Sequence, residues 1–374
     1  MKLLHRAMPR WAFFIVLRCL SIGIVTAAEP PPPAVAPFTE KQAKSHQEAW
    51  SKHLGVPIEQ KNSLGMKLVL IPPGEFSMGS TPAQVEAALM LLKTVPRAAP
   101  GEADRIQNEE QPQHRVVLPK PFRLGRTEVT VGKFRQFVEA AKYVTETERF
   151  GGGNSSKIAE TDPVKQKALW SSPGYKVTDE SPVTQLTWND MVAFCNWLSR
   201  ASQLTPYYRI RGAEVEVAGG NGYRLLTEAE WEYCCRAGTT TQFASGNDPD
   251  GLADVGNVAD GMAKTTINLS NAIAAKDGYV FTAPVEMFRS NGFELFDMHG
   301  NVWEWCEDGY DAAAYETASV DSPSGPLKAS NRLVRGGGWG DAPASCRSAF
   351  RFRNPPEDRG NSLGFRIARS QSSR

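Results

Sequence analysis

Long stretches rich in glycine and proline separate the few segments of this chain that have a regular apolar pattern. The sequence holds 32 glycines and 26 prolines, and both residues mark turns and interrupt helices and strands. The regular segments are short, and their apolar residues recur either at helical spacing or in unbroken runs. This pattern predicts an α+β fold in a single loop-rich domain. A length of 374 residues is also compatible with two domains, and composition alone does not distinguish these arrangements.

Three helices are predicted where a threonine cap precedes apolar residues spaced three or four positions apart. The caps are Thr130, Thr187 and Thr227. Asp190 and Glu230 follow the last two caps by three residues, which is the spacing of a capping box. The apolar faces consist of Val131, Phe134, Phe137 and Val138 in the first helix, Met191, Phe194, Cys195 and Leu198 in the second, and Trp231 and Cys235 in the third.

Residues 1–28 have the pattern of an export signal. Basic residues precede an apolar run over 11–25, and small residues at 26–28 offer a cleavage site. Arg18 interrupts the apolar run, so its pieces are shorter than the roughly 20 residues that a membrane-spanning helix needs. We therefore expect a secreted or periplasmic protein with no stable membrane span after cleavage; an uncleaved anchor is the alternative.

A linker and a short helix are expected over 29–61, before the main domain. Prolines at 30–33 and 37 predict a stiff, extended linker that keeps the domain clear of whatever precedes it. Thr39 and Gln42 have capping-box spacing, which predicts a helix over 39–54.

The main domain is expected over 62–370. Unbroken or alternating apolar residues predict strands at 67–71, 115–118 and 348–353. The stretch 87–108 contains proline and small residues without sharp turn signals, so it is expected to be a flexible insertion.

Charge and cysteine content exclude several classes of protein. A formal net charge of +1 gives no basic field for nucleic acid. Export would favour one or two disulfides, but the odd number of cysteines after residue 28 leaves at least one thiol free or paired between chains. There is no Cys-x-x-Cys motif, and the scattered histidines form no catalytic-triad signature. The cysteines concerned are Cys195, Cys234, Cys235, Cys306 and Cys346.

Seven segments, taken in order, resemble those of the sulfatase-modifying factor family, which includes the formylglycine-generating enzymes. Among them are Arg-Leu-Leu-Thr-Glu-Ala-Glu-Trp-Glu-Tyr at 224–233 and Gly-Asn-Val-Trp-Glu-Trp at 300–305. The resemblance runs from about 62 to 369 and implies a fold related to C-type lectins, in agreement with the loop-rich prediction. The remaining segments are 65–79, 127–130, 143–151, 182–188 and 335–353 with 362–366.

The resemblance also implies a copper site, and this chain departs from it. In the family, two cysteines that follow the aromatic of a Gly-Gly-x-aromatic motif by two and seven residues bind copper(I), and the enzyme oxidises a cysteine in a Cys-x-Pro-x-Arg segment to formylglycine. Counted from Trp339, these positions are Asp341 and Cys346. Copper(I) is soft and prefers sulfur, whereas a carboxylate is hard, so we do not expect copper here.

The expected substrate groove has diverged as well. Glu128 and Trp303 match a substrate-facing glutamate and an active-site tryptophan of the family. Gly338 stands where the family has a serine, and Arg359 and Ser362 stand where it has a serine and an asparagine.

The family's familiar disulfides are also absent from this sequence. The positions that would pair with Cys195 and Cys235 are Ile367 and Arg351. Cys346 is then either a small buried residue, a replacement partner for Cys235 or a remnant of the catalytic pair.

Two constellations resemble the family's calcium sites, in which a hard cation is held by carboxylates and backbone carbonyls. Judged on the residues alone, isolated carboxylates in loops are more often turn formers or solvated charges. The resemblance favours calcium in a structural role, holding loops together. The first set is Asn257, Val258, Asp277 and Tyr279, and the second is Asp297, Gly300, Val302 and Glu304.

These observations give three hypotheses for function. The first is an exported, calcium-stabilised domain that binds a peptide or protein segment and has lost or altered the copper chemistry. The second is an active protein-cysteine oxidase with a changed metal site at Asp341 and Cys346. The third is a module that binds carbohydrate or cell-surface material.

Overall fold

The computed structural model of the chain describes residues 29–94, 100–150, 168–212, 214–269, 272–317, 319–321, 323–326 and 328–371. The described residues from Pro31 onward form one compact unit, which confirms the predicted loop-rich α+β domain. The predicted export signal at 1–28 lies outside the described residues. Within those ranges, no helix has the length and apolar character needed to cross a membrane.

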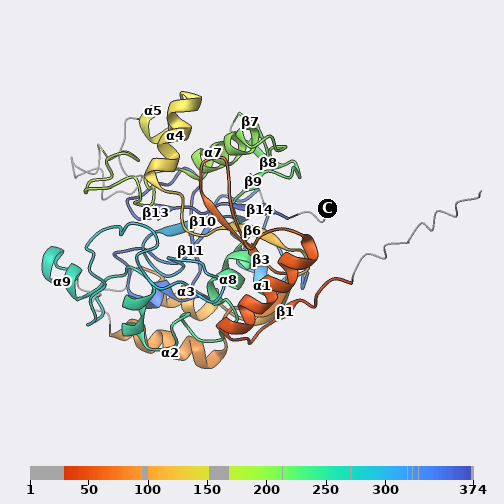
Figure 1. Cartoon of the computed structure of the whole chain (residues 1–374). Helices are drawn as coiled ribbons and strands as arrows, with labels where there is room; N and C mark the ends of the chain where they lie inside the picture. The colour runs from red at the N-terminus through yellow and green to blue at the C-terminus, as the bar shows by residue number, and fades with distance from the viewer. Residues whose placement is uncertain are drawn as a thin grey trace, which may run out of the picture. The chain divides into compact units, whose positions relative to one another are not determined.

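The centre of the unit is a five-stranded antiparallel sheet that joins the two ends of the domain (Figure 1). Its C-terminal strand lies between strands from the first and the middle parts of the chain. In spatial order the strands are β2 (Glu59–Lys61), β3 (Lys67–Ile71), β6 (Phe122–Gly125), β14 (Ala368–Ser370) and β9 (Tyr223–Arg224).

Two smaller sheets and a hairpin complete the strands of the described chain. The four-stranded sheet, in spatial order, contains β12 (Phe352–Asn354), β11 (Arg332–Arg335), β10 (Trp303–Gly309) and β13 (Leu363–Gly364). The three-stranded sheet contains β1 (Ala34–Val35), β4 (Gly74–Met78) and β5 (His114–Leu118). The hairpin pairs β7 (Tyr208–Arg211) with β8 (Glu214–Val217).

The predicted helices form where their caps place them. The hydroxyls of Thr39, Thr130, Thr187 and Thr227 each accept a hydrogen bond from the backbone three residues on, as the capping rule requires. The helices are α1 (Glu40–Leu54), α4 (Val131–Ala141), α7 (Trp188–Ala201) and α8 (Glu228–Arg236). Helices α4 and α7 pack against each other, at the top of the view in Figure 1. The shorter helices are α5 (Glu146–Arg149), α9 (Gly261–Ile267), α10 (Ala314–Thr317) and the 3₁₀ turns η2 (Pro249–Asp254) and η3 (Pro343–Cys346).

The prediction of a flexible insertion at 87–108 is wrong. Helices α2 (Pro82–Lys93) and α3 (Glu102–Asn108) occupy most of this stretch, and Thr81 with Gln84 forms a capping box that the sequence analysis overlooked. The helices are held by apolar packing, because Val85, Ala88 and Ile106 are buried against Ala344 and Phe350. The pair therefore covers the segment that carries Cys346.

Part of the proline-rich segment packs against the domain. Strand β1 pairs in parallel with β4, and the side chain of Ala34 is fully buried. The indole of Trp50 on α1 donates a hydrogen bond to the carbonyl of Pro32 at 3.3 Å. From Pro32 to Ala34 the segment is thus held on the domain.

The strand predicted at 348–353 is largely absent, because β12 begins only at Phe352. Arginine side chains that turn inward account for the missing part of the strand. Arg351 is 1 % exposed and pairs with Glu228, and Arg347 is 1 % exposed and pairs with Glu110. An alternating pattern of apolar and charged residues does not indicate that the charged side chains face inward.

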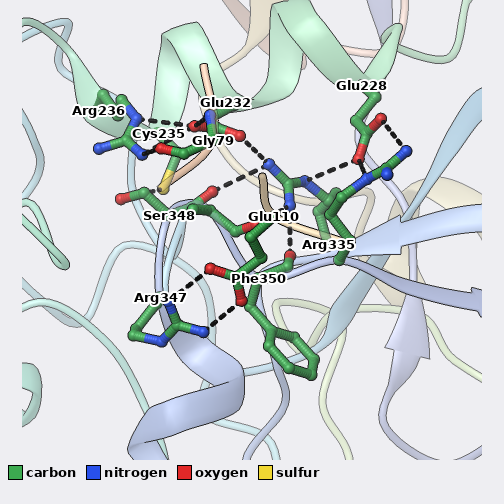
Figure 2. A network of polar contacts seen from close by, with 12 residues as sticks. Gly79, Glu110, Glu228, Glu232, Cys235, Arg236, Arg335, Arg347, Ser348 and Phe350 are labelled. Atoms are coloured by element: carbon green, nitrogen blue, oxygen red, sulfur yellow. Dashed lines mark hydrogen bonds and ion pairs between the residues drawn. The ribbon is translucent and has the colours of Figure 1, made fainter. Parts of the chain in front are cut away.

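These arginines belong to a buried network of ion pairs around the start of the C-terminal segment (Figure 2). Glu232 on α8 is fully buried between Arg236 and Arg335 and also accepts a hydrogen bond from the backbone of Gly79 at 2.9 Å. Burial alone would raise the pKa of Glu232, but the two guanidinium groups outweigh it and hold the pKa below its ordinary value. Arg335 also donates to the carbonyls of Ser348 and Ala349.

Replacing Arg335 by methionine should destabilise the protein by about 3–5 kcal/mol, because Glu232 would keep only part of its compensation in a buried site. Urea unfolding followed by circular dichroism measures the change. Arg135→Met is the matched control, since Arg135 forms a half-exposed pair with Asp179 and should change stability by less than about 1 kcal/mol. Equal losses in the two variants would show that the buried network does not stabilise the fold.

Candidate functional site

Three backbone segments bring Trp303, Gly338, Asp341 and Ser362 together. The indole Nε1 of Trp303 donates to Asp341 Oδ2 at 2.7 Å, and the backbone N–H of Gly338 donates to the same oxygen at 3.0 Å. The backbone N–H of Trp303 donates to the carbonyl of Ser362 at 2.8 Å. A Cβ added at Gly338 would lie 2.9 Å from Cβ of Ser362, so glycine is the residue that this close approach allows.

Asp341 is a hydrogen-bond acceptor for its own loop. Burial raises the pKa of its carboxyl to about 6. The hydrogen bonds from Trp303 and Gly338 act in the opposite direction and lower the pKa, but they do not outweigh burial. The neighbouring charge of Glu102 on α3 raises it further. The residue as a whole is partly exposed.

Cys346 is an interior residue. Its side chain is fully buried in a cluster with Phe243, Leu252 and Val258, and burial raises the pKa of the thiol well above its ordinary value. Gly337 lies directly against it, since a Cβ there would stand 2.4 Å from Cys346 Sγ. With its pKa raised in this way, the thiol is protonated at neutral pH and a poor nucleophile.

The residues present do not fit copper(I). One of the two expected thiolates is a carboxylate already held by Trp303, and the other is a protonated thiol inside the core.

Two other predicted groove residues, Glu128 and Arg359, have hydrogen-bond partners of their own. Glu128 is only 1 % exposed and accepts a hydrogen bond from Asn301 Nδ2 at 3.0 Å. Burial, together with the nearby carboxylate of Asp297, raises its pKa well above the ordinary range. Arg359 is partly exposed and contacts the carbonyl of Glu357. Substrate binding by these two residues stays a prediction.

The first candidate calcium site has donor atoms that fit the ion. Asn257 uses its amide N–H₂ on the carbonyl of Phe281 and on Asn301, which leaves Oδ1 buried without a hydrogen-bond partner in the described structure. The carboxylate of Asp277 lies nearby and accepts hydrogen bonds from the backbone of Val258 and Tyr279. Burial raises the pKa of Asp277 to about 6, so a cation beside it would favour the ionised form.

The second candidate site fits only in part. Asp297 Oδ2 accepts a hydrogen bond from the backbone N–H of Glu286 at 3.1 Å, and the Asp297 carboxyl also makes a side-chain hydrogen bond with Glu128. Glu304 accepts hydrogen bonds from Arg366 and from the indole of Trp231 on its two carboxylate oxygens. A calcium ion at this position would have to share Glu304 with the Arg366 guanidinium.

The expected disulfides are not formed, and this prediction is corrected. All five cysteines from Cys195 to Cys346 are free and buried. Cys235, the proposed partner of Cys346, contacts His299 instead, with Sγ 3.6 Å from Nε2. His299 Nδ1 donates to the Cys346 carbonyl at 2.8 Å, so an imidazole rather than a disulfide connects the two positions.

Sequence reasoning missed two features around Asp341. Glu102 on α3 accepts a hydrogen bond from the hydroxyl of Ser345, next to Cys346. A partly exposed aromatic cluster adjoins the site, in which Trp339 packs edge-on against Tyr175 and Phe281. The capping box at Thr81 is the sequence signal that would have predicted helix α2. The aromatic cluster joins residues that are far apart in the sequence, so no sequence pattern indicates that they lie together.

Comparisons with known proteins place this architecture among domains of the formylglycine-generating-enzyme type. The structure of PvdO from Pseudomonas aeruginosa is similar, with a TM-score of 0.62 and 27 % identity over 84 % of this chain and 98 % of that one. The family model of the sulfatase-modifying factor enzyme 1-like domain matches residues 55–371. The chain therefore belongs to the sulfatase-modifying factor family.

Curated relatives include both active and inactive enzymes by name. The chain is 31 % identical over 328 residues to the formylglycine-generating enzyme of Mus musculus, covering 81 % of this chain and 74 % of the relative. It is 28 % identical over 341 residues to the inactive C-alpha-formylglycine-generating enzyme 2 of Bos taurus, covering 83 % and 90 %. Membership of the family thus does not by itself imply the oxidation reaction.

The pKa of Asp341 has a defined effect on stability. The folded-state value of about 6 lies above the ordinary 3.8, so between these pH values the folded protein binds more protons than the unfolded chain. The contribution of this group to the free energy of unfolding therefore falls as the pH rises through the window, and the loss is complete above the folded-state pKa.

We expect the indole N–H resonance of Trp303 to titrate with a midpoint near pH 6, because it donates to the carboxyl that ionises. Two-dimensional ¹H–¹⁵N NMR measures this, with the signal assigned through Trp303→Phe. The titration should disappear in Asp341→Asn. The indole of Trp339, which donates to the carbonyl of Asn361, is the internal control and should not respond. A Trp303 titration that persists in Asp341→Asn would contradict the assignment.

Proposed function

We propose that this chain is an exported, calcium-stabilised member of the family that binds an extended peptide or protein segment and no longer carries out the copper-dependent oxidation of cysteine. The observation that carries the proposal is the hydrogen bonding of Asp341. Its carboxylate stands at the first copper position and accepts from both Trp303 and Gly338. The residue that replaces the cysteine is thus integrated into the loop as a structural acceptor.

The state of Cys346 supports the same conclusion. Formylglycine formation in the family uses a pair of thiolates, and a single protonated thiol packed under Gly337 supplies no second ligand. The relationship to a named inactive enzyme of Bos taurus is consistent with loss of the reaction in this family.

Peptide binding is supported by the surface that remains around Asp341. Trp303, Trp339, Tyr175 and Phe281 are each partly exposed, and rings of this kind supply rigid apolar contact area. Asp341 adds a carboxylate at one edge of this surface, which suits the N–H donors of a polypeptide.

The copper reaction is tested on a synthetic Cys-x-Pro-x-Arg peptide, incubated with the mature chain, copper and oxygen and analysed by mass spectrometry. We expect no formylglycine from the unmodified chain, while the Mus musculus enzyme serves as the positive control. Cys346→Ser should be equally silent. Formylglycine from the unmodified chain that is lost in Cys346→Ser would overturn the proposal and make Cys346 catalytic.

An Asp341→Cys variant asks whether this one substitution accounts for the loss. Product from the variant alone would mean that only the missing thiolate separates the chain from an enzyme. If the variant is folded and silent, burial of Cys346 and the changes at Gly338 and Ser362 contribute as well.

Calcium should raise the melting temperature of the unmodified chain relative to EGTA, since an ion bound only by the folded state at 100 times its Kd stabilises by about 2.7 kcal/mol. Differential scanning fluorimetry measures the shift. Asn257→Ala should abolish most of the shift because it removes the unpartnered oxygen, whereas Asn108→Ala on the exposed surface of α3 should retain it. An unmodified chain that melts at the same temperature with calcium and with EGTA would rule out calcium as a stabilising ligand.

A further inference from the structure

Asn301 lies between the first candidate calcium site and the loop that carries Asp341. The residue is fully buried, and its backbone has a left-handed φ of 58°. Residues other than glycine rarely adopt such a φ, although asparagine tolerates it better than most. A rare backbone conformation persists in a buried position only when the contacts around it hold it there. The hydrogen bonds of Asn301 show which segments do so.

On one side, Asn301 holds Asn257, a predicted calcium ligand. The backbone N–H of Asn301 donates to the carbonyl of Asn257 at 2.6 Å, and Asn257 Nδ2 donates to Asn301 Oδ1 at 3.2 Å. The same Nδ2 donates to the carbonyl of Phe281 at 2.7 Å. These two bonds engage the amide nitrogen of Asn257, so the amide oxygen is the atom left for a cation.

On the other side, Asn301 holds residues of the proposed groove. Its backbone carbonyl accepts a hydrogen bond from the N–H of Trp339 at 2.9 Å, and its Nδ2 donates to Glu128 Oε1 at 3.0 Å. The ring of Trp339 packs edge-on against Phe281, with the ring centroids 5.1 Å apart. Both Trp339 and Phe281 are therefore bonded to groups that also fix the position of Asn257.

A second connection runs through the backbone next to Asn257. The N–H of Val258 donates to Asp277 Oδ2 at 2.9 Å, and the N–H of Ala259 donates to the carbonyl of Asp341 at 3.1 Å. The three-residue segment 257–259 thus contacts the Asp277 carboxylate and the Asp341 loop at the same time. A change in the position of this segment would move the backbone of Asp341.

A calcium ion at the first candidate site would hold two segments together. Its proposed ligands come from 257–258 and from 277–279, and calcium needs six to eight oxygen ligands, so it would bind best when both segments are in place. A ligand shifts an equilibrium only through its different affinity for the two states. Here the state that calcium favours is also the one in which Trp339 and Asp341 are held.

We propose that calcium at this site orders the peptide-binding groove, and that Asn301 is the positioning residue that connects the ion to the groove. The inference rests on the function proposed above, because it takes both the calcium site and the groove from it. It adds regulation to that function, since the groove would be fully ordered only where calcium is present.

The test measures amide hydrogen exchange by NMR in the full mature chain, once with calcium and once with EGTA. The N–H groups of Trp339 and Ala259 should exchange at least about fivefold more slowly with calcium, which is the lower end of a usual coupling between two sites. The N–H of Gly132, which donates to the carbonyl of Asp179 outside this network, is the internal control and should change little. Equal slowing at the three amides would indicate general stabilisation alone and would overturn the proposal.

Thermal melting of the same samples separates this inference from the proposed function. If calcium raises the melting temperature but does not selectively slow exchange at Trp339 and Ala259, the coupling is refuted and calcium stabilisation stands. If calcium changes neither quantity, both the coupling and the calcium-stabilised state are refuted.

An Asn301→Gly variant tests the positioning role of the side chain. Glycine adopts a left-handed φ without strain, and the substitution keeps the backbone bonds to Asn257 and Trp339. Loss of Oδ1 should leave the Asn257 amide poorly oriented and weaken calcium binding by about tenfold, as measured by isothermal titration calorimetry. Asn268→Gly is the matched control, because Asn268 is exposed and has the same φ of 58°.

Equal calcium affinity in the folded Asn301→Gly and Asn268→Gly variants would show that the Asn301 side chain does not position the site. The exchange experiment uses the unmodified chain, so it decides the coupling even where Asn301→Gly does not fold.

Discussion

This fold has few long strands or helices. Buried carboxylate–guanidinium pairs hold its loops together instead. Glu232 on α8 is shared by Arg236 and Arg335, and neither oxygen of its carboxylate has any exposure to water. Removing one partner of a buried pair costs far more than an exposed pair contributes, because the remaining charge is left without compensation. The partners come from segments that are distant in sequence, as Glu110 and Arg347 illustrate. Each pair therefore fixes the position of one loop relative to another.

The candidate site depends directly on this arrangement. The loop that carries Asp341 begins at Arg335 and ends at Arg347, and both arginines are anchored in buried ion pairs. Between these anchors the backbone turns through two glycines with positive φ, Gly336 and Gly337. The second of these glycines lies against Cys346 and closes the core over its thiol. A loop fixed at both ends places the Asp341 carboxylate where Trp303 can donate to it.

Local chemistry made much of the fold predictable from sequence. The threonine caps at Thr130, Thr187 and Thr227 set the starts of α4, α7 and α8, because a side-chain oxygen three residues from a backbone N–H is a short-range requirement. Motif resemblance then supplied the family, and the position of Asp341 within it. Both kinds of information are contained in segments of a few residues.

Long-range contacts account for what sequence reasoning missed. Arg351 lies in the segment predicted as a strand and Arg347 directly precedes it, yet both side chains turn inward to pair with Glu228 and Glu110. The pairing of Cys235 with His299 instead of another cysteine likewise depends on side chains 64 positions apart. No local pattern in the sequence reveals such partners. The calcium ligands and groove residues likewise come from distant segments, and they remain predictions.

The five buried thiols make the lifetime of the protein depend on how fast it unfolds. In the folded state each cysteine from Cys195 to Cys346 is shielded from oxidants by the core. If the chain is exported and cleaved as proposed, unfolding in an oxidising compartment would expose these thiols with no native pairing to guide them, and mispaired disulfides would trap the chain. Under that proposal the survival of the folded protein depends on the rate at which it unfolds, which is a kinetic property.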